Sequence, residues 1–204
     1  MRSALYVSGS KSDPLDAEIL LDLLKHHRDH LRKLEADTVE TRKLRLLVED
    51  RRALVNERTR AVNQLRAKLK LYYPQVMDWV DDLASPLAWA FLQRWPTLGE
   101  LKRARWETVR KFFWAHGSRS EARMEQRRVE IPGAVIATAD EAVVEASVRM
   151  VLVLVKLLVE LDQGILGYDR AIRETAAVHE DFGIYDSLPG AGAVMVPRLI
   201  AAMG

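Results

Sequence analysis

Two long stretches of the chain, residues 37–73 and 138–179, repeat apolar residues every seven positions. No proline or glycine interrupts the first stretch. Its apolar sets are Val48, Val55, Val62 and Leu69, and Leu44, Leu65 and Tyr72. Because such a repeat keeps one apolar stripe along a helix, each stretch predicts a long helix that packs against another helix.

Charged residues interrupt both repeats, and in each repeat they stand one heptad apart. Arg51 and Arg58 occupy the first repeat, and Asp162 and Asp169 occupy the second. In an antiparallel pair, numbers that sum to about 220 would lie opposite each other, so Arg58 meets Asp162 and Arg51 meets Asp169. A charge in an apolar seam is costly unless an opposite charge meets it. We therefore expect an antiparallel coiled coil in this register, formed within one chain or across a dimer interface.

The segment between the two repeats, residues 75–137, has a different composition. It contains all five tryptophans of the chain, and proline and glycine divide it into short pieces. The tryptophans recur at helical spacing, which is more typical of a buried core than of a platform for stacking bases. The segment predicts a small helical insert with an aromatic core.

The net charge of +2 is unevenly distributed. Residues 42–70 contain ten Lys or Arg and three Asp or Glu, whereas residues 131–186 contain four and ten. The basic part either pairs with the acidic part or binds nucleic acid. The absence of cysteine is consistent with a reducing compartment. The most apolar run, residues 150–159, is about half a bilayer span and contains Lys156, so we expect a cytoplasmic protein with no membrane partner.

The C-terminal stretch "DSLPGAGAVMVPRLIAAMG", residues 186–204, places a glycine-rich turn before an apolar helix. This pattern is typical of a helix–hairpin–helix, in which the hairpin backbone approaches a phosphate. A plain turn before a helix is the alternative interpretation.

Near the start of the chain, "KSDPLDA" precedes an apolar run. Asp13 is predicted to be the N-cap of a helix that begins near Pro14 and ends near His27. Asp13 and Asp16 lie one helical turn apart, and their carboxylates are the oxygen donors that Mg²⁺ prefers. Phosphodiester chemistry normally needs more than two carboxylates, so the cap interpretation competes with a metal site.

Together, "KSDPLDAEIL", the arm "RRALVNERTRAVNQLRAKLKLYYP" and "SLPGAGAVMVPRLIAAMG" resemble the DEDD-type transposases of bacterial insertion sequences. These are the bridge-RNA-guided recombinases of insertion-sequence family one-hundred-and-ten. The resemblance implies a RuvC-like domain whose acidic set holds Mg²⁺, with Asp13 and Asp16 matching its last two aspartates. It also implies a coiled coil for assembly, a helix–hairpin–helix, and a later nucleophilic serine.

The resemblance further implies that the chain is the middle portion of such an enzyme, truncated at both ends. The first two acidic residues would precede Lys11 and the serine would follow Gly204. Asp13 and Asp16 would then be an incomplete catalytic and metal set, with no Mg²⁺ bound by this chain. Whether the chain is an enzyme stays open at this point.

From these patterns we expect an all-α fold of long antiparallel coiled-coil helices with a Trp-rich insert and a C-terminal helix–hairpin–helix. The expected parts are a RuvC-like remnant (1–30), a first arm (31–74), the insert (75–137), a second arm (138–183) and the start of the transposase domain (184–204).

Two functions remain open. The first is a transposase fragment for DNA transposition and recombination, which binds DNA and a guide RNA and assembles as a homo-oligomer. The expected nucleic-acid-binding residues are Arg42, Arg45, Arg52, Arg60, Arg66, Gly190 and Gly192. The alternative is a coiled-coil scaffold with no nucleic-acid role. His26 and His30 could ligate zinc, but no third ligand stands at a suitable spacing, so an exposed helix face is the simpler interpretation.

Overall fold

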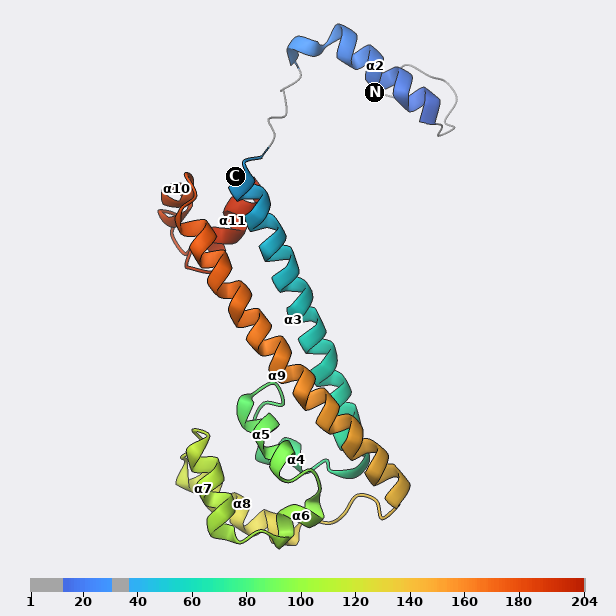
Figure 1. Cartoon of the computed structure of the whole chain (residues 1–204), viewed down its shortest axis with the longest axis vertical. Coiled ribbons are helices and arrows are strands. Elements are labelled where there is room, and N and C mark those ends of the chain that lie inside the picture. The colour runs from blue at the N-terminus through green and yellow to red at the C-terminus, as the bar shows by residue number, and fades with distance from the viewer. Residues whose placement is uncertain (1–12, 31–36, 204) are drawn as a thin grey trace. The chain divides into compact units, whose positions relative to one another are not determined.

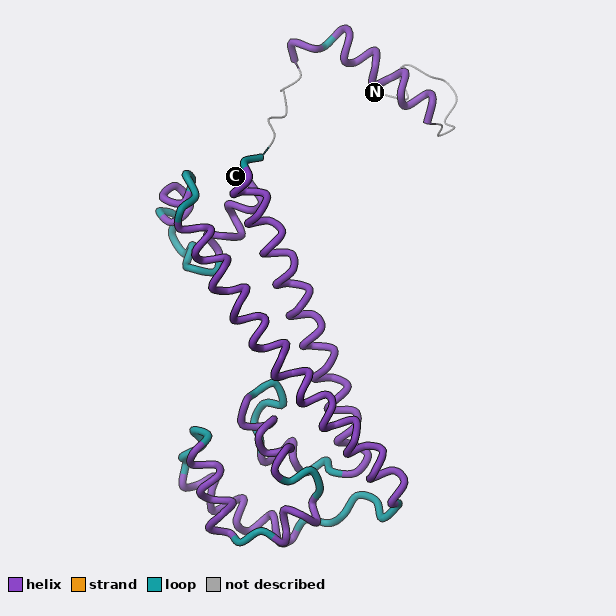
Figure 2. The backbone as a smooth tube through the Cα atoms, viewed as in Figure 1, coloured by secondary structure: helices purple, strands orange, loops and turns teal. Residues whose placement is uncertain are grey.

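The structure is a computed structural model that describes residues 13–30 and 37–203. Within these residues every regular element is helical, so the expected all-α class is confirmed for this part of the chain (Figures 1 and 2). Lys11 and Ser12, which open the "KSDPLDA" motif, lie outside the described residues. The chain divides into two units, Met1–Thr38 and Val39–Gly204.

The first unit contains α2 (Asp13–His26) and the 3-10 helix η1 (Arg28–His30). Helix α2 begins one residue earlier than the sequence predicted, so Asp13 is its first residue. The helices of the second unit are α3 (Val39–Tyr72), α4 (Val76–Trp79), α5 (Pro86–Arg94), α6 (Leu98–Arg103), α7 (Trp106–Ala115), α8 (Glu121–Gly133), α9 (Glu141–Ala177), α10 (Phe182–Asp186) and α11 (Met195–Met203).

Helices α3 and α9 are the two predicted arms, and they pack side by side in opposite directions (Figure 1). Helix α3 ends at Tyr72, two residues before Pro74, which disfavours helical backbone in the residue that precedes it. Helix α9 begins after Asp140, whose carboxylate accepts hydrogen bonds from the N–H groups of Ala142 and Val143 at 3.0 and 3.4 Å. This is an ordinary N-cap, and it fixes the start of the second arm.

Two ion pairs set the register of the helices. The Nη1 of Arg58 lies 3.0 Å from Oδ1 of Asp162, and the Nη2 of Arg51 donates to Oδ2 of Asp169 at 3.2 Å. Both predicted pairs are therefore confirmed, and the pairing lies within one chain. The four charged side chains are less buried than their positions in the apolar seam suggested, because they keep between 23% and 33% of their surface exposed.

A third polar contact follows the same register. The hydroxyl of Tyr168 donates to Oδ2 of Asp50 at 3.2 Å. The negative charge of Asp50, and then this hydrogen bond, raise the pKa of the Tyr168 hydroxyl above its ordinary value. The phenol therefore keeps its proton, and the contact persists, at neutral pH.

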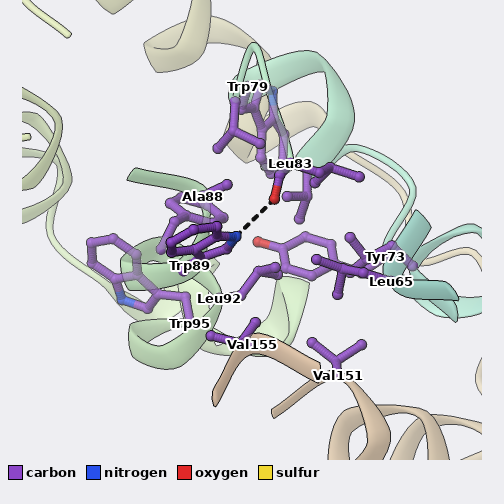
Figure 3. Close-up of a cluster of buried hydrophobic side chains, with 14 of the residues drawn as sticks. Leu65, Tyr73, Trp79, Leu83, Ala88, Trp89, Leu92, Trp95, Val151 and Val155 are labelled. Carbon is purple, nitrogen blue, oxygen red and sulfur yellow. Dashed lines mark hydrogen bonds between the residues drawn. The ribbon is translucent and has the colours of Figure 1, made fainter. Parts of the chain in front are cut away.

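The apolar seam between α3 and α9 continues into the core of the Trp-rich insert (Figure 3). Leu65 of α3 and Val151 and Val155 of α9 are buried beside Trp89 and Tyr73. The Nε1–H of Trp89 donates to the carbonyl of Leu83 at 2.9 Å, so burial of the indole leaves no donor unpaired. The insert therefore packs at the Tyr73 end of the helix pair, as the sequence predicted.

The tryptophans of the insert do not all belong to this core. Trp79, Trp89 and Trp95 are buried, as expected, and Trp106 is half-buried. Trp114, in contrast, keeps 43% of its surface exposed. The expectation of a core role is therefore wrong for Trp114, which lies in the last turn of α7.

Arg127 of α8 is buried and joins three parts of the insert. Its Nε and Nη2 donate to the carbonyl of Trp79 at 3.0 and 2.7 Å. Its Nη1 donates to Oγ of Ser118 at 2.9 Å, and its guanidinium carbon lies 3.9 Å from the ring centroid of Phe113. These hydrogen bonds and the contact with the aromatic ring together offset the cost of burying the guanidinium charge.

The register pairs provide a test of the fold through stability. Replacing Asp162 with alanine should lower the free energy of unfolding by about 1–3 kcal/mol, because it strands the partly buried Arg58. The matched control is Glu145→Ala on the same helix, whose pair with Arg149 is mostly exposed. That substitution should cost about 0–1 kcal/mol. Equal effects in urea denaturation would contradict a structural role for the seam pair.

Two neighbouring tyrosines provide a second test. The hydroxyl of Tyr72 donates to the carbonyl of Pro96 at 2.9 Å, whereas the buried hydroxyl of Tyr73 has no hydrogen-bond partner among the described residues. Tyr72→Phe should therefore lose about 1 kcal/mol of stability, and Tyr73→Phe should lose none or gain slightly. The opposite order of melting temperatures would show that the Tyr73 hydroxyl is bonded.

Candidate nucleic-acid interface

The C-terminal segment consists of α10, a turn at residues 187–194 and α11, and this turn is called the hairpin below. The segment is anchored to one end of the helix pair through α11. Val196 and Ile200 of α11 are buried with Leu44 of α3 and Ile172 of α9. The Nε of Arg45 donates to the carbonyl of Ala201 at 3.0 Å, which adds a polar contact between α3 and α11. The hairpin is therefore positioned by both long helices.

A second polar contact closes this end of the pair. His179 is buried just after α9, and its Nε2 lies 2.8 Å from Oγ1 of Thr41 on α3. Its Nδ1 accepts from the backbone N–H of Asp181 at 3.2 Å, which leaves Nε2 to donate to the Thr41 hydroxyl. The end of α9 is thereby fixed against the start of α3.

A groove of about 420 Å³ lies where α3, α9 and the start of α11 meet. Its apolar lining comes from Val48, Val55, Ile172, Ala193 and Val194. Its charged lining comes from Arg51, Arg52, Asp169, Arg173 and Arg198. Four arginines thus share the groove with one aspartate.

The charge of the groove is mostly uncompensated. Arg51 is held by Asp169, so this pair contributes little net charge. Arg52, Arg173 and Arg198 are exposed, and none of them makes a salt bridge within residues 13–30 and 37–203. Three free guanidinium groups around an apolar floor are suited to an anion such as phosphate.

The backbone of the hairpin adds donors at the same groove. Gly190 has a φ of 83°, a left-handed conformation that glycine adopts without strain. The carbonyl of Gly192 accepts from the N–H groups of Met195 and Val196 at 2.8 and 3.1 Å and so begins α11. The N–H groups of Ala193 and Val194 have no acceptor in the described part of the chain. Unpaired N–H groups at a helix start favour an anion.

The expected nucleic-acid-binding residues are dispersed over the surface. Arg52 lines the groove, whereas Arg45 is half-buried against Ala201. Arg60 pairs with Glu57, and the Nη1 of Arg66 donates to Oδ1 of Asn63 at 3.1 Å. Arg42 is exposed on α3, and Gly190 and Gly192 are exposed in the hairpin.

Sequence reasoning missed Arg173 and Arg198. Arg173 belongs to an arm whose overall charge is acidic, and Arg198 follows Pro197 in a stretch that was assigned to an apolar helix. The available signal was the predicted register, which places the end of α9 beside the start of α3. Combining that register with the position of the hairpin would have brought these arginines near Arg52.

The described residues do not complete a metal site. Asp16 is half-exposed on α2, and the side chain of Asp13 is not among those that the structure describes. Within the described ranges no three His, Asp or Glu side chains come together to hold a metal ion. His26 and His30 are exposed, as expected. Two carboxylates of one helix do not fit the several that phosphoryl transfer with Mg²⁺ requires.

In the described part of the chain, no helix combines the length and apolar character needed to cross a membrane. The apolar run at residues 150–159 belongs instead to α9. Its buried residues include Val151, Val155 and Leu158. This stretch is part of the seam between the long helices.

The sequence of the chain is similar to proteins of bacterial insertion elements. Residues 1–74 match the family model of the IS110-type DEDD proteins, described as "Transposase". The chain is 29% identical over 210 residues to the "Insertion element IS116 uncharacterized 44.8 kDa protein" of Streptomyces clavuligerus. It is 27% identical over 206 residues to the "Mini-circle putative transposase for IS117" of Streptomyces coelicolor. No solved structure matches the chain.

These alignments cover 99% and 97% of the chain but only 50% and 49% of the two relatives. The chain therefore spans about half the length of the curated relatives it matches. Residues 1–74 thus match the family model of the IS110-type DEDD transposases, and nearly all of the chain is similar in sequence to half of two insertion-element proteins.

Proposed function

We propose that this chain is the nucleic-acid-binding and assembly part of a DNA transposase, and that it binds phosphates through the groove between α3, α9 and α11. The observation that carries the proposal is the convergence of Arg52, Arg173 and Arg198 on one groove. These residues come from three different helices, α3, α9 and α11. The family match of residues 1–74 supports DNA as the partner.

The groove is suited to a phosphate backbone more than to a base edge. Guanidinium groups and unpaired backbone N–H groups are among the donors that hydrogen-bond to phosphate oxygens in protein–DNA complexes. The apolar floor holds Val48, Val55 and Ile172, which offer no hydrogen bonds to read a base. We therefore expect binding with little sequence preference and a strong dependence on salt.

A helix–hairpin–helix interpretation of α10, the turn and α11 belongs to this proposal. Helix α10 ends at Asp186, and the turn that follows contains Pro189, Gly190 and Gly192. Helix α11 tolerates Pro197 because this residue is the third of the helix, where no intrahelical N–H is needed. The hairpin would hold a phosphate at the start of α11, beside Arg198.

Binding is the role that the described residues support, and Asp13 and Asp16 by themselves do not provide a catalytic step. The Mg²⁺ that the family resemblance implies would need carboxylates beyond these two. A guide RNA is a second nucleic acid that the same groove could hold, since RNA and DNA share the phosphate chemistry that the arginines recognise.

Self-association is a second candidate role, and an exposed apolar stripe on α9 favours it. Met150, Val153 and Leu157 recur at spacings of three and four residues, which places them on one helix face. They are 38%, 59% and 45% exposed. Pairing of this face between copies would give the homo-oligomer that the coiled-coil interpretation predicts. Mass measured by light scattering, with and without Val153→Glu, tests it.

The groove is tested by the triple variant Arg52→Ala, Arg173→Ala, Arg198→Ala in a mobility-shift titration of duplex DNA at several salt concentrations. The slope of log K against log salt is negative, and each lost phosphate contact should reduce its magnitude by about 0.9, so the magnitude should fall by about 2–3. Affinity at low salt should fall at least about tenfold.

The matched control is Arg128→Ala, Arg149→Ala, Lys156→Ala, which removes the same charge from exposed sites outside the groove. It should change the affinity only slightly. Equal losses in the two variants would show that binding follows net charge and not the groove. No DNA or RNA binding by the unmodified chain at low salt would instead favour the scaffold alternative.

A further inference from the structure

Trp114 stands apart from the other aromatic side chains of the insert. It lies in the last turn of α7 and keeps 43% of its surface exposed, whereas Phe112 and Phe113 beside it are buried. Burying an indole stabilises a fold, so Trp114 contributes less to the core of the insert than the buried Trp79, Trp89 and Trp95 do. Its exposed ring is available to a partner.

Basic side chains lie near this ring. Trp114 lines a hollow of about 280 Å³ together with Glu107, Arg110, Lys111 and Ala115. Arg110 lies 3.8 Å from Glu107, so this pair is partly neutralised. Lys111 and Arg119 make no salt bridge among the described residues. The guanidinium carbon of Arg119 lies 6.0 Å from the Trp114 ring centroid, at the limit of a cation–π contact.

The composition of this surface favours a nucleic acid over an apolar protein partner. Hot spots of protein–protein interfaces lie in well-packed, fully desolvated pockets, and charged side chains are depleted at the core of such interfaces. Here the hollow offers only Ala115 as a further apolar residue, and its other three linings are charged. An aromatic face flanked by cations is the arrangement by which proteins hold unpaired bases and the phosphates beside them.

We propose that Trp114, with Lys111 and Arg119, binds single-stranded nucleic acid by stacking one unpaired base on the indole and holding the neighbouring phosphates. A base within a duplex is already stacked on both faces, so this surface selects unpaired strands. The site lies on α7 and the turn after it and shares no residue with the arginine groove. The proposal therefore does not depend on the function of the groove.

The test is fluorescence-anisotropy binding of a labelled single-stranded DNA of about 12 nucleotides and of its duplex. Trp114→Ala should weaken single-strand binding by about 5- to 100-fold, because one base–aromatic stack is lost. Trp114→Phe should retain most of the affinity, since a phenyl ring still stacks. Duplex affinity should change less than about twofold in both variants.

The matched control is Leu71→Ala, which removes an apolar side chain of similar exposure, 50%, from α3, outside the groove and outside the exposed apolar stripe of α9. It should leave both affinities unchanged. Quenching of tryptophan fluorescence by bound single strand gives a second readout that does not depend on comparing affinities. This quenching should largely disappear in Trp114→Phe while binding persists.

Several outcomes would overturn the proposal. They are absence of single-strand binding by the unmodified chain, equal losses for single strand and duplex in Trp114→Ala, and quenching that persists in Trp114→Phe. Undiminished single-strand affinity in Trp114→Ala would also reject it. Thermal melting of each variant checks that the exposed substitutions leave the insert folded. If Trp114→Ala fails that check, the fluorescence result with Trp114→Phe decides.

Discussion

The two ion pairs between α3 and α9 are the constraint on which the second unit depends. Both arginines and both aspartates stand one heptad apart, so one register satisfies them together. A slip of one heptad would pair Arg58 with Asp169 but would leave Arg51 against Ala176 and Asp162 against Leu65. An unpaired charge at such a position costs more than a lost apolar contact, so the pairs specify the register as well as stabilise it.

Everything at the two ends of the pair follows from this register. At one end, it brings Leu44 and Ile172 together, and α11 packs on them. The same alignment places Arg52 and Arg173 on one groove with Arg198 of α11. At the other end, Leu65 and Val155 complete the core of the insert. The candidate interface is thus a consequence of helix packing and not of any single motif.

Sequence patterns predicted the large features of the fold because these features depend on repetition. The arms, their direction and the Arg–Asp pairs follow from apolar and charged positions that recur every seven residues. Individual exposures could not be predicted in this way. The spacing of Trp114 is that of a core residue, yet the insert leaves it open, and the buried Arg127 looks like any surface arginine in sequence. Arg173 and Arg198 reach the groove through tertiary packing, which no local pattern encodes.

The register is tested most directly by distances between spin labels, measured by pulsed electron–electron double resonance. The chain contains no cysteine that would compete for the labels. Cysteines replace exposed residues in two double variants, Lys70→Cys with Arg149→Cys, and Lys70→Cys with Glu174→Cys. The first pair should give a short distance, because packed helix axes lie about 8–10 Å apart. The second should be longer by roughly 20–30 Å, because Glu174 lies about 37 Å further along α9 than Arg149 at about 1.5 Å of rise per residue. Both distances should persist when labelled protein is diluted with unlabelled protein. A short distance in the second pair, or one in the first that disappears on dilution, would contradict an antiparallel pairing within one chain.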